Sequence, residues 1–192
     1  MSGGRCGVRE YGRGSTMVWG EEEVAEELWE RREGWIRSYS DRLIVGGVAV
    51  TSFQQLEASG ASGEERERVG GWLLYITAHT CQVEEVRAGL ASGAPVDRVG
   101  GVDSPLQATV LCSDPLPPDH PALLETATLV CLAGADPARR WRYPNGKSMV
   151  EMALDCNQFV MFHLLLLSIR DPLALEEPIL QDSESADKAR IA

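Results

Sequence analysis

A short segment rich in cations and aromatic rings, residues 137–147, has the residue types best suited to recognising another molecule. Guanidinium groups bind carboxylates through paired hydrogen bonds, and arginine, tryptophan and tyrosine dominate the binding energy of many protein interfaces. The cations of this segment stand out because the rest of the chain is acidic. We expect them to bind an acidic stretch of a partner protein. The alternative is a solvated turn with its tryptophan folded back onto the chain. The predicted contact residues are Arg139, Arg140, Trp141, Arg142, Tyr143 and Lys147.

Residues that could carry out catalysis are few. A cysteine nucleophile needs a histidine within hydrogen-bond reach, and Cys156, which follows Asp155, could form such a pair with His163. Both are expected on one helical hairpin and packed in the core, and His163 is expected to be a core or interface histidine. No metalloprotease, serine-hydrolase or phosphate-loop motif occurs. We therefore predict no enzyme activity, no cofactor, no metal and no small-molecule substrate.

Charge and composition restrict the class of partner. The 192 residues carry a net charge of −11, which opposes binding to nucleic acid and to anionic membranes. The longest apolar run, 159–169, is shorter than the roughly 18 residues that a membrane span requires, and it is expected to form a buried helix. The five cysteines are odd in number and include no CxxC pair, which favours reduced thiols and an intracellular location, cytoplasmic or nuclear.

A Gly-Ala pair that recurs along the chain indicates how these residues are positioned. It stands at Gly60-Ala61, Gly93-Ala94 and Gly134-Ala135, each time after an apolar run with helical spacing. The first two copies are 93 − 60 = 33 residues apart, and the third follows after 134 − 93 = 41. The proline-rich stretch 113–121 accounts for the longer second interval. A period of about 33 residues is typical of stacked helical hairpins.

The chain resembles the ankyrin repeat family in residues 39–170. In the unit 70–101, Gly70 stands at the family's opening glycine, Leu74 and Ala78 at core positions, and Gly93-Ala94 at its close. In the next unit, Ser104-Pro105-Leu106 resembles the family's Thr-Pro-Leu, although Tyr75 replaces the family's histidine in the unit before it. The resemblance implies an all-α, ankyrin-like solenoid of three to four repeats that binds proteins through first helices and the projecting turns between repeats, called fingers.

The helices of these hairpins can be placed from apolar spacing and turn residues. We expect helices at 72–79 and 83–92, with Gly93 in the left-handed conformation that ends a helix. Ser104 should cap the next helix, 122–133 should follow the proline-rich loop, and the last hairpin should comprise 148–154 and 159–168. The expected organisation is a flexible leader (1–19, alternatively a transit peptide), an N-terminal capping helix (20–38), a degenerate repeat (39–69), repeats 70–101 and 102–145, a terminal cap (146–170) and an acidic flexible tail (171–192).

These features together predict a non-catalytic protein-interaction module, an adaptor, scaffold or inhibitor, that binds another protein. The alternative is a structural subunit of a larger assembly. Further possible contact sites are the loop around Leu116, the charge run 64–68, expected in a finger, and the acidic helix 21–37. The favoured explanations of these three segments are, in order, a tolerated insertion, a solvated charge run and a simple N-terminal cap.

Overall fold

The computed structural model describes residues 21–97, 104–111, 116, 119–140 and 146–170. These residues are mostly helical, as the sequence predicted, apart from one short β-hairpin. The elements are α1 (Glu21–Ser38), a 3-10 turn (Ser40–Arg42), β1 (Ile44–Val45), β2 (Val48–Ala49), α2 (Phe53–Ala58), α3 (Gly63–His79), α4 (Val83–Ala91), α5 (Pro105–Leu111), α6 (Pro121–Leu132), α7 (Met149–Asp155) and α8 (Phe159–Arg170).

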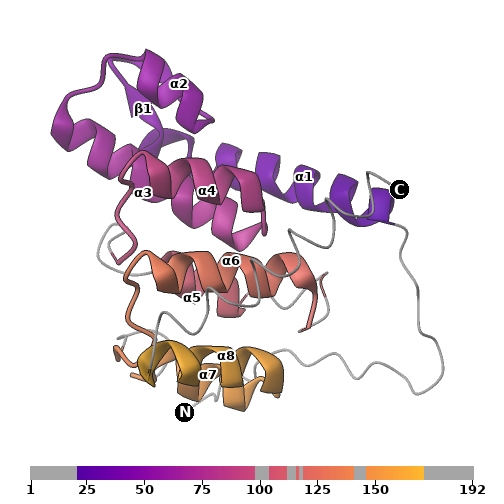
Figure 1. The fold of residues 1–192 in the computed structure, drawn as a ribbon. Helices are drawn as coiled ribbons and strands as arrows, with labels where there is room; N and C mark the ends of the chain where they lie inside the picture. Colours follow the sequence, from indigo (N-terminus) through magenta and orange to yellow (C-terminus); the bar gives the residue numbers. More distant parts are fainter. Residues whose placement is uncertain (1–20, 98–103, 112–115, 117–118, 141–145, 171–192) are drawn as a thin grey trace, which may run out of the picture.

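The helices from α3 to α8 form hairpins that lie one upon another (Figure 1). Helix α3 pairs with α4, α5 with α6, and α7 with α8. Helix α5 lies between α3 and α7, and α6 lies between α4 and α8, so the first helices form one row and the second helices another. The core is continuous through these layers, because each hairpin covers the apolar stripe of its neighbour.

The recurring glycines end helices in the left-handed conformation, as predicted for Gly93. Gly60, Gly93 and Gly134 have φ of +64°, +79° and +99°. At the end of α4, Gly93 N donates to Leu90 O at 3.0 Å and Ala94 N donates to Gly89 O at 3.0 Å. The equivalent bonds close α6. This is the Schellman arrangement, which satisfies carbonyls that the helix itself leaves without a donor.

The turn inside a hairpin has its own repeated geometry. Cys81 and Asn157 are the non-glycine residues with positive φ in the described part of the chain, at +51° and +57°. Each lies between the two helices of a hairpin and is followed by a glutamine, Gln82 or Gln158. Gln158 is fully buried, and its Nε2 donates to Val110 O at the end of α5 at 3.1 Å. This contact fixes the last hairpin to the one before it.

Helix α3 begins nine residues earlier than the expected Trp72, at Gly63 (72 − 63 = 9). Ser62 caps it, and Glu65 completes a capping box by accepting from Ser62 N at 3.1 Å. The charge run 64–68, expected in a finger, therefore lies in the first turns of α3. Arg68 donates from this run to Arg42 O and Ile44 O at 2.6 and 2.8 Å.

Residues 39–69 do not form the helical hairpin that the degenerate repeat required. The expected first helix is replaced by the antiparallel pair β1–β2, in which Ile44 faces Ala49 and Val45 faces Val48. Gly46 and Gly47, both with positive φ, make the two-residue turn between the strands. The second half matches better, because Val50, Phe53 and Leu56 are all buried at 2% exposure, with the latter two on α2.

Helix α1 corresponds to the charged helix expected at 20–38, and it packs against α3. Ile36 is buried in the core, and the Arg32 side chain is only 5% exposed. Arg32 Nη2 donates to Thr51 O at 2.7 Å, which ties α1 to the segment before α2. The leader (1–19) and the tail (171–192) lie outside the described residues.

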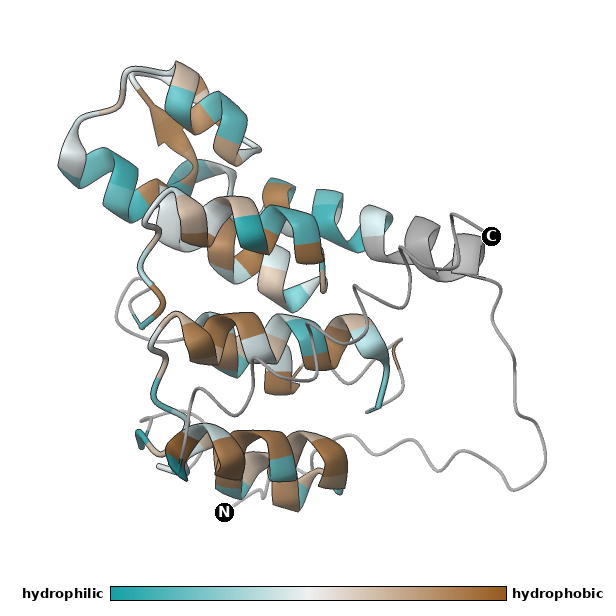
Figure 2. Cartoon of the chain, viewed as in Figure 1, coloured by the Kyte–Doolittle hydropathy of each residue, from teal (hydrophilic) through white to brown (hydrophobic). Residues whose placement is uncertain are grey.

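Serine residues cap helices α5 and α7, and the cap at Ser104 was predicted. Ser104 Oγ accepts from Gln107 N at the start of α5, and Ser148 Oγ accepts from Glu151 N at the start of α7. Helix α8 continues through Ile169 and Arg170, where the other hairpins have Gly-Ala. Figure 2 shows that apolar residues colour most of α8, while α4 carries many polar ones.

Candidate protein-binding surfaces

The predicted basic segment is only partly described, and its described cations bind acids of the same chain. Arg139 Nη1 lies 3.6 Å from the Asp97 carboxylate. Arg140 Nη2 donates to Glu151 Oε1 at 2.9 Å, and its Nη1 donates to Gly146 O at 3.1 Å. Lys147 pairs with Asp155. Trp141, Arg142 and Tyr143 lie outside the described residues.

These ion pairs connect successive layers of the stack. Asp97 follows α4, whereas Arg139 follows α6, so their contact joins two neighbouring fingers. Arg140 and Lys147 in turn bind α7. The pKa of Glu151 is lowered, chiefly by the Ser148 backbone N–H and further by Arg140, and that of Lys147 is raised by its hydrogen bond to Asp155. Exposed pairs of this kind stabilise a fold by about 1 kcal/mol or less.

These contacts also affect how strongly the basic segment attracts an acidic partner. Burial raises the pKa of Asp97, while the Arg139 charge opposes that rise. Arg139, Arg140 and Lys147 each have an acidic neighbour, so their attraction for an acidic partner is partly satisfied within the chain. The role of the segment as a binding site stays a prediction.

Cys156 and His163, the residues considered for catalysis, do not line a buried site in the described part of the chain. His163 is exposed on α8, so the expectation that it is a core histidine is wrong, while an interface role stays a prediction; its Nδ1 lies 2.7 Å from Phe159 O of its own helix. Cys156 is half-buried in the turn before α8. Among the described residues, no cluster of His, Cys, Asp and Glu could hold a metal ion, and none of the helices combines the length and apolarity needed to cross a bilayer.

None of the cysteines in the described part of the chain, Cys81, Cys131 and Cys156, forms a disulfide. Cys81 and Cys131 are buried, and burial raises the pKa of Cys131 to about 11, although a hydrogen bond with Ser168 opposes the rise. A thiol with so high a pKa is a poor nucleophile. Cys131 therefore serves as a small apolar side chain between α6 and α8.

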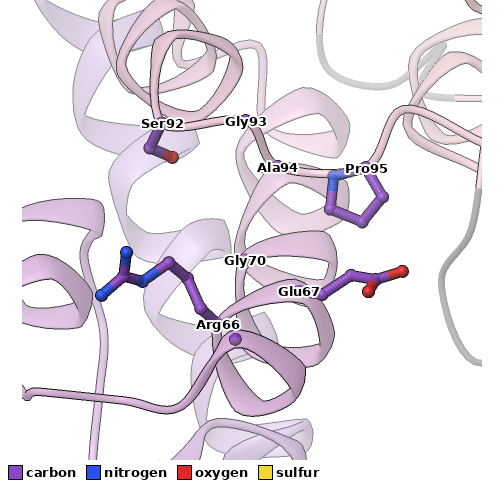
Figure 3. Close-up of a pocket in the computed structure, with 8 residues that line it drawn as sticks. Arg66, Glu67, Gly70, Ser92, Gly93, Ala94 and Pro95 are labelled. Carbon is purple, nitrogen blue, oxygen red and sulfur yellow. The ribbon is translucent and has the colours of Figure 1, made fainter.

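The loop around Leu116 does not present that residue to a partner, because Leu116 is buried at 1% exposure. A shallow polar depression lies where the start of α3 meets the finger after α4 (Figure 3). Arg66 and Glu67 point to opposite sides of it, while Gly70 lies beneath Ala94. A Cβ on Gly70 would be only 3.6 Å from Ala94 Cβ, so the depression reflects close packing of the finger on α3. No group in it suggests a ligand.

Aromatic rings join α1 to α3. Trp35 stacks on Tyr39 with 5.3 Å between ring centroids, and Tyr39 stacks on Trp72 at 4.7 Å. The Trp35 ring also lies 4.2 Å from that of His79. Arg42 lies over Trp72 at 5.8 Å, in a cation–π contact. Trp35 on α1 and Tyr39 directly after it both contact rings of α3. We therefore infer that this aromatic cluster holds α1 against α3.

The outer surface of α8 is apolar and exposed, contrary to the expectation that 159–169 is a buried helix. The buried side chains of α8 are Met161, Leu165 and Ser168, and the opposite side faces outward. The exposed large apolar residues on α8 and the adjacent end of α7 are Leu154 (48%), Phe159 (56%), Val160 (50%), Leu167 (50%) and Ile169 (46%). A helix with apolar residues on all sides normally lies inside a larger structure.

Aligning the hairpin turns on Gln82 and Gln158 shows how unusual this surface is. The register pairs Glu84 with Val160, Arg87 with His163 and Ala91 with Leu167, and all six residues are exposed. Helix α4 is therefore polar or small at the outward positions where α8 carries two large aliphatic side chains. This surface was not predicted from the sequence, although the alignment of the two hairpin turns needs only the sequence.

Comparison with protein-family models, with curated proteins and with solved structures finds no match to this chain.

Proposed function

We propose that the chain is a non-catalytic protein-interaction module, an adaptor, scaffold or inhibitor, built on an ankyrin-like stack of helical hairpins. The observation that carries the proposal is the exposed apolar surface of α8, which we call the α8 face: Phe159, Val160, His163, Leu167 and Arg170. Large contiguous apolar patches on a protein surface commonly mark sites where another protein binds.

The stack supports the proposal because it leaves α8 uncovered at one end. Helix α6 is covered on two sides, by α4 and α8, whereas within the described residues α8 has α6 on one side only. The next layer would lie on the free side of the last hairpin. A partner that binds the α8 face removes its apolar side chains from water.

The predicted contacts of the basic segment belong to this proposal as a second binding surface. Arg140 is 69% exposed at its side chain even though it binds Glu151, so it is accessible to a partner. A carboxylate of the partner would compete with Glu151 for the guanidinium. The partner that fits both surfaces is a protein with an apolar helix and an acidic segment beside it.

The alternative, a structural subunit of a larger assembly, is favoured by the same exposed face. A surface that is buried permanently in a complex is more apolar than one that exchanges partners. Purification of the chain without its partner distinguishes the two proposals. An adaptor stays monodisperse, whereas an obligate subunit aggregates through the exposed side chains of α8.

Affinity purification from cells of the native source tests the proposal. The bait is the full chain, and bound proteins are quantified by mass spectrometry for the wild type, for Leu167→Glu and for Ala91→Glu. Ala91 occupies the equivalent exposed position on α4, which makes it the matched control. We expect a partner that binds the wild type and Ala91→Glu but is lost with Leu167→Glu. Equal capture by all three variants would contradict the role of α8.

The basic segment is tested separately with Arg140→Glu combined with Trp141→Ala. If the segment binds an acidic stretch, this variant loses the same partner at low salt, and increasing salt weakens the wild-type complex. Retention of the partner by this variant would limit the binding surface to α8.

A further inference from the structure

We propose that the α8 face binds the α8 face of a second copy of this chain, with the two helices antiparallel across a two-fold axis. This inference rests on the proposed function and deepens it by naming the occupant. It starts from the residues of the face, which form one stripe along the 12-residue helix. At 100° per residue, Val160, His163 and Leu167 lie on the side opposite to buried Met161 and Leu165.

The stripe is complementary to itself when the axis passes between positions 163 and 164. In an antiparallel pair with that centre, two residues of the two copies face each other when their residue numbers add up to 327, as 163 and 164 do. Val160 then faces Leu167 of the second copy, and Leu167 faces Val160, so one apolar contact is made twice. A two-fold interface requires this reciprocity. The two His163 side chains lie nearest the axis, where small shifts of either helix change their spacing least.

The charged residues near the face also match across the axis. Arg170 is the charged residue of the α8 face, and in this pairing it lies at the level of Asn157 of the second copy. Asp155 ends α7 two residues before Asn157, and its side chain is 46% exposed. Arg170 of each copy thus comes near Asp155 of the other, which already binds Lys147 of its own copy, so this exposed contact adds specificity rather than much affinity.

The charges of the surrounding surface favour a second copy over a strongly charged partner. Asp155 is paired with Lys147, and Glu151 is paired with Arg140, so the described border of the face presents balanced charge. Two copies can therefore approach here although each carries a net charge of −11. Screening by salt reduces the long-range repulsion between the copies, so association should be unchanged or stronger as salt rises. A complex with a basic partner would weaken.

Sedimentation velocity of the full chain over a range of concentrations tests the proposal. The wild type is expected to shift from monomer to dimer as concentration rises, and the shift should persist from about 50 to about 500 mM NaCl. Val160→Glu combined with Leu167→Ala gives α8 the residues that α4 has at these positions. We expect the dimer dissociation constant of this variant to be at least about tenfold higher than that of the wild type, because two symmetric apolar contacts are lost in each dimer. Ala91→Glu on α4 should dimerise like the wild type.

A disulfide test probes the geometry independently of affinity. His163→Cys places a thiol beside its symmetry mate, so mild oxidation should link the two copies through residue 163, which peptide mass mapping identifies. Arg87→Cys, at the equivalent position on α4, should not form the corresponding link. Far-UV circular dichroism confirms that each variant is folded.

The outcomes separate this inference from the proposed function. A wild type that stays monomeric at every concentration, or a dimer that Val160→Glu with Leu167→Ala leaves intact, overturns the self-association. If that monomer still captures a partner that Leu167→Glu loses, the proposed function stands with a different occupant. Absence of both a dimer and a partner overturns both.

Discussion

The hairpins α3–α4 and α7–α8 share their turns and differ in the surface that they present. Each begins with a serine–glutamate capping box, Ser62 with Glu65 and Ser148 with Glu151. Each has a left-handed residue between its helices, and a glutamine follows it. In both, the second helix packs one side against the neighbouring hairpin. The turn chemistry therefore determines the hairpin, whatever the outer side chains are.

The second helices differ on both of their sides. Toward the core, Gly89 of α4 occupies the position of Leu165 in α8. A glycine is required there because a Cβ on Gly89 would lie 2.4 Å from Phe53 Cζ. Toward solvent, Glu84 and Ala91 occupy the positions of Val160 and Leu167. Helix α4 is thus shaped by α2 above it, and α8 carries the apolar side chains of a helix that another element covers. A stack of equivalent hairpins can differ in function through the residues of one face.

Exchanging the core residues of α4 and α8 should give the largest effects. Leu165 is fully buried, and Leu165→Ala should destabilise the fold by about 2–5 kcal/mol through the cavity that it leaves. Gly89→Leu should destabilise by about 1–3 kcal/mol, because Phe53 is buried and cannot move aside freely. Urea unfolding followed by circular dichroism measures both.

The control for this pair is Ala88→Leu, one residue earlier on α4 and exposed. Its effect should stay within about 0.5 kcal/mol. If Gly89→Leu proved as neutral as this control, the packing of α2 on α4 would differ from the arrangement described, and the contrast between the two second helices would lose its core half.

The sequence was most informative where one residue type determines the backbone. Gly93 was expected to be left-handed from its place after an apolar run, and it is; Gly134, which follows a similar run, has the same conformation. The start of α3 was missed although Ser62 and Glu65 have the spacing of a capping box. Gly46-Gly47 is poor helix material within the expected repeat 39–69, and this pair makes the turn of the β-hairpin. In both cases local turn chemistry outweighed the period of the repeat.

The α8 face was harder to predict for a physical reason. A run such as 159–169 is apolar on every side, so its spacing does not show which side is buried. Burial depends on how many neighbours the stack supplies, and that is a property of position in the array. The ion pairs of Arg139 and Arg140 were missed for a similar reason, because their partners, Asp97 and Glu151, are distant in sequence.

Removing either capping serine should give a smaller effect of equal size in both hairpins. Ser62→Ala and Ser148→Ala should each destabilise the fold by about 1 kcal/mol at neutral pH. The pKa values of Glu65 and Glu151 are lowered from 4.5, mainly by the backbone N–H groups of these serines. A lowered pKa means stability that is present above pH 4.5 and is lost as the pH falls through the folded value.

The pH dependence of the caps gives a second measurement. Urea midpoints at pH 7 and at about pH 3 should show acid destabilisation of the wild type that Glu65→Gln and Glu151→Gln each reduce. A markedly larger effect in one hairpin would show that the caps are not equivalent, and that the likeness of the two hairpins ends at their turns.

The smallest effect on stability, and the sharpest test of the contrast, is expected when α4 receives the outer residues of α8. Glu84→Val, Arg87→His and Ala91→Leu together remove the contacts of Arg87 with Glu125 and Glu84, which are exposed, so the free energy of unfolding should change by less than about 1 kcal/mol. The change creates an exposed apolar stripe on the outer side of α4, where the wild type has charged and small residues. Sedimentation velocity should then show association beyond that of the wild type, because a second copy or a further molecule can cover the new stripe. If the chain with two apolar stripes sediments like the wild type, exposed aliphatic residues at these positions are insufficient for binding, and the geometry at the end of the stack must supply the remainder.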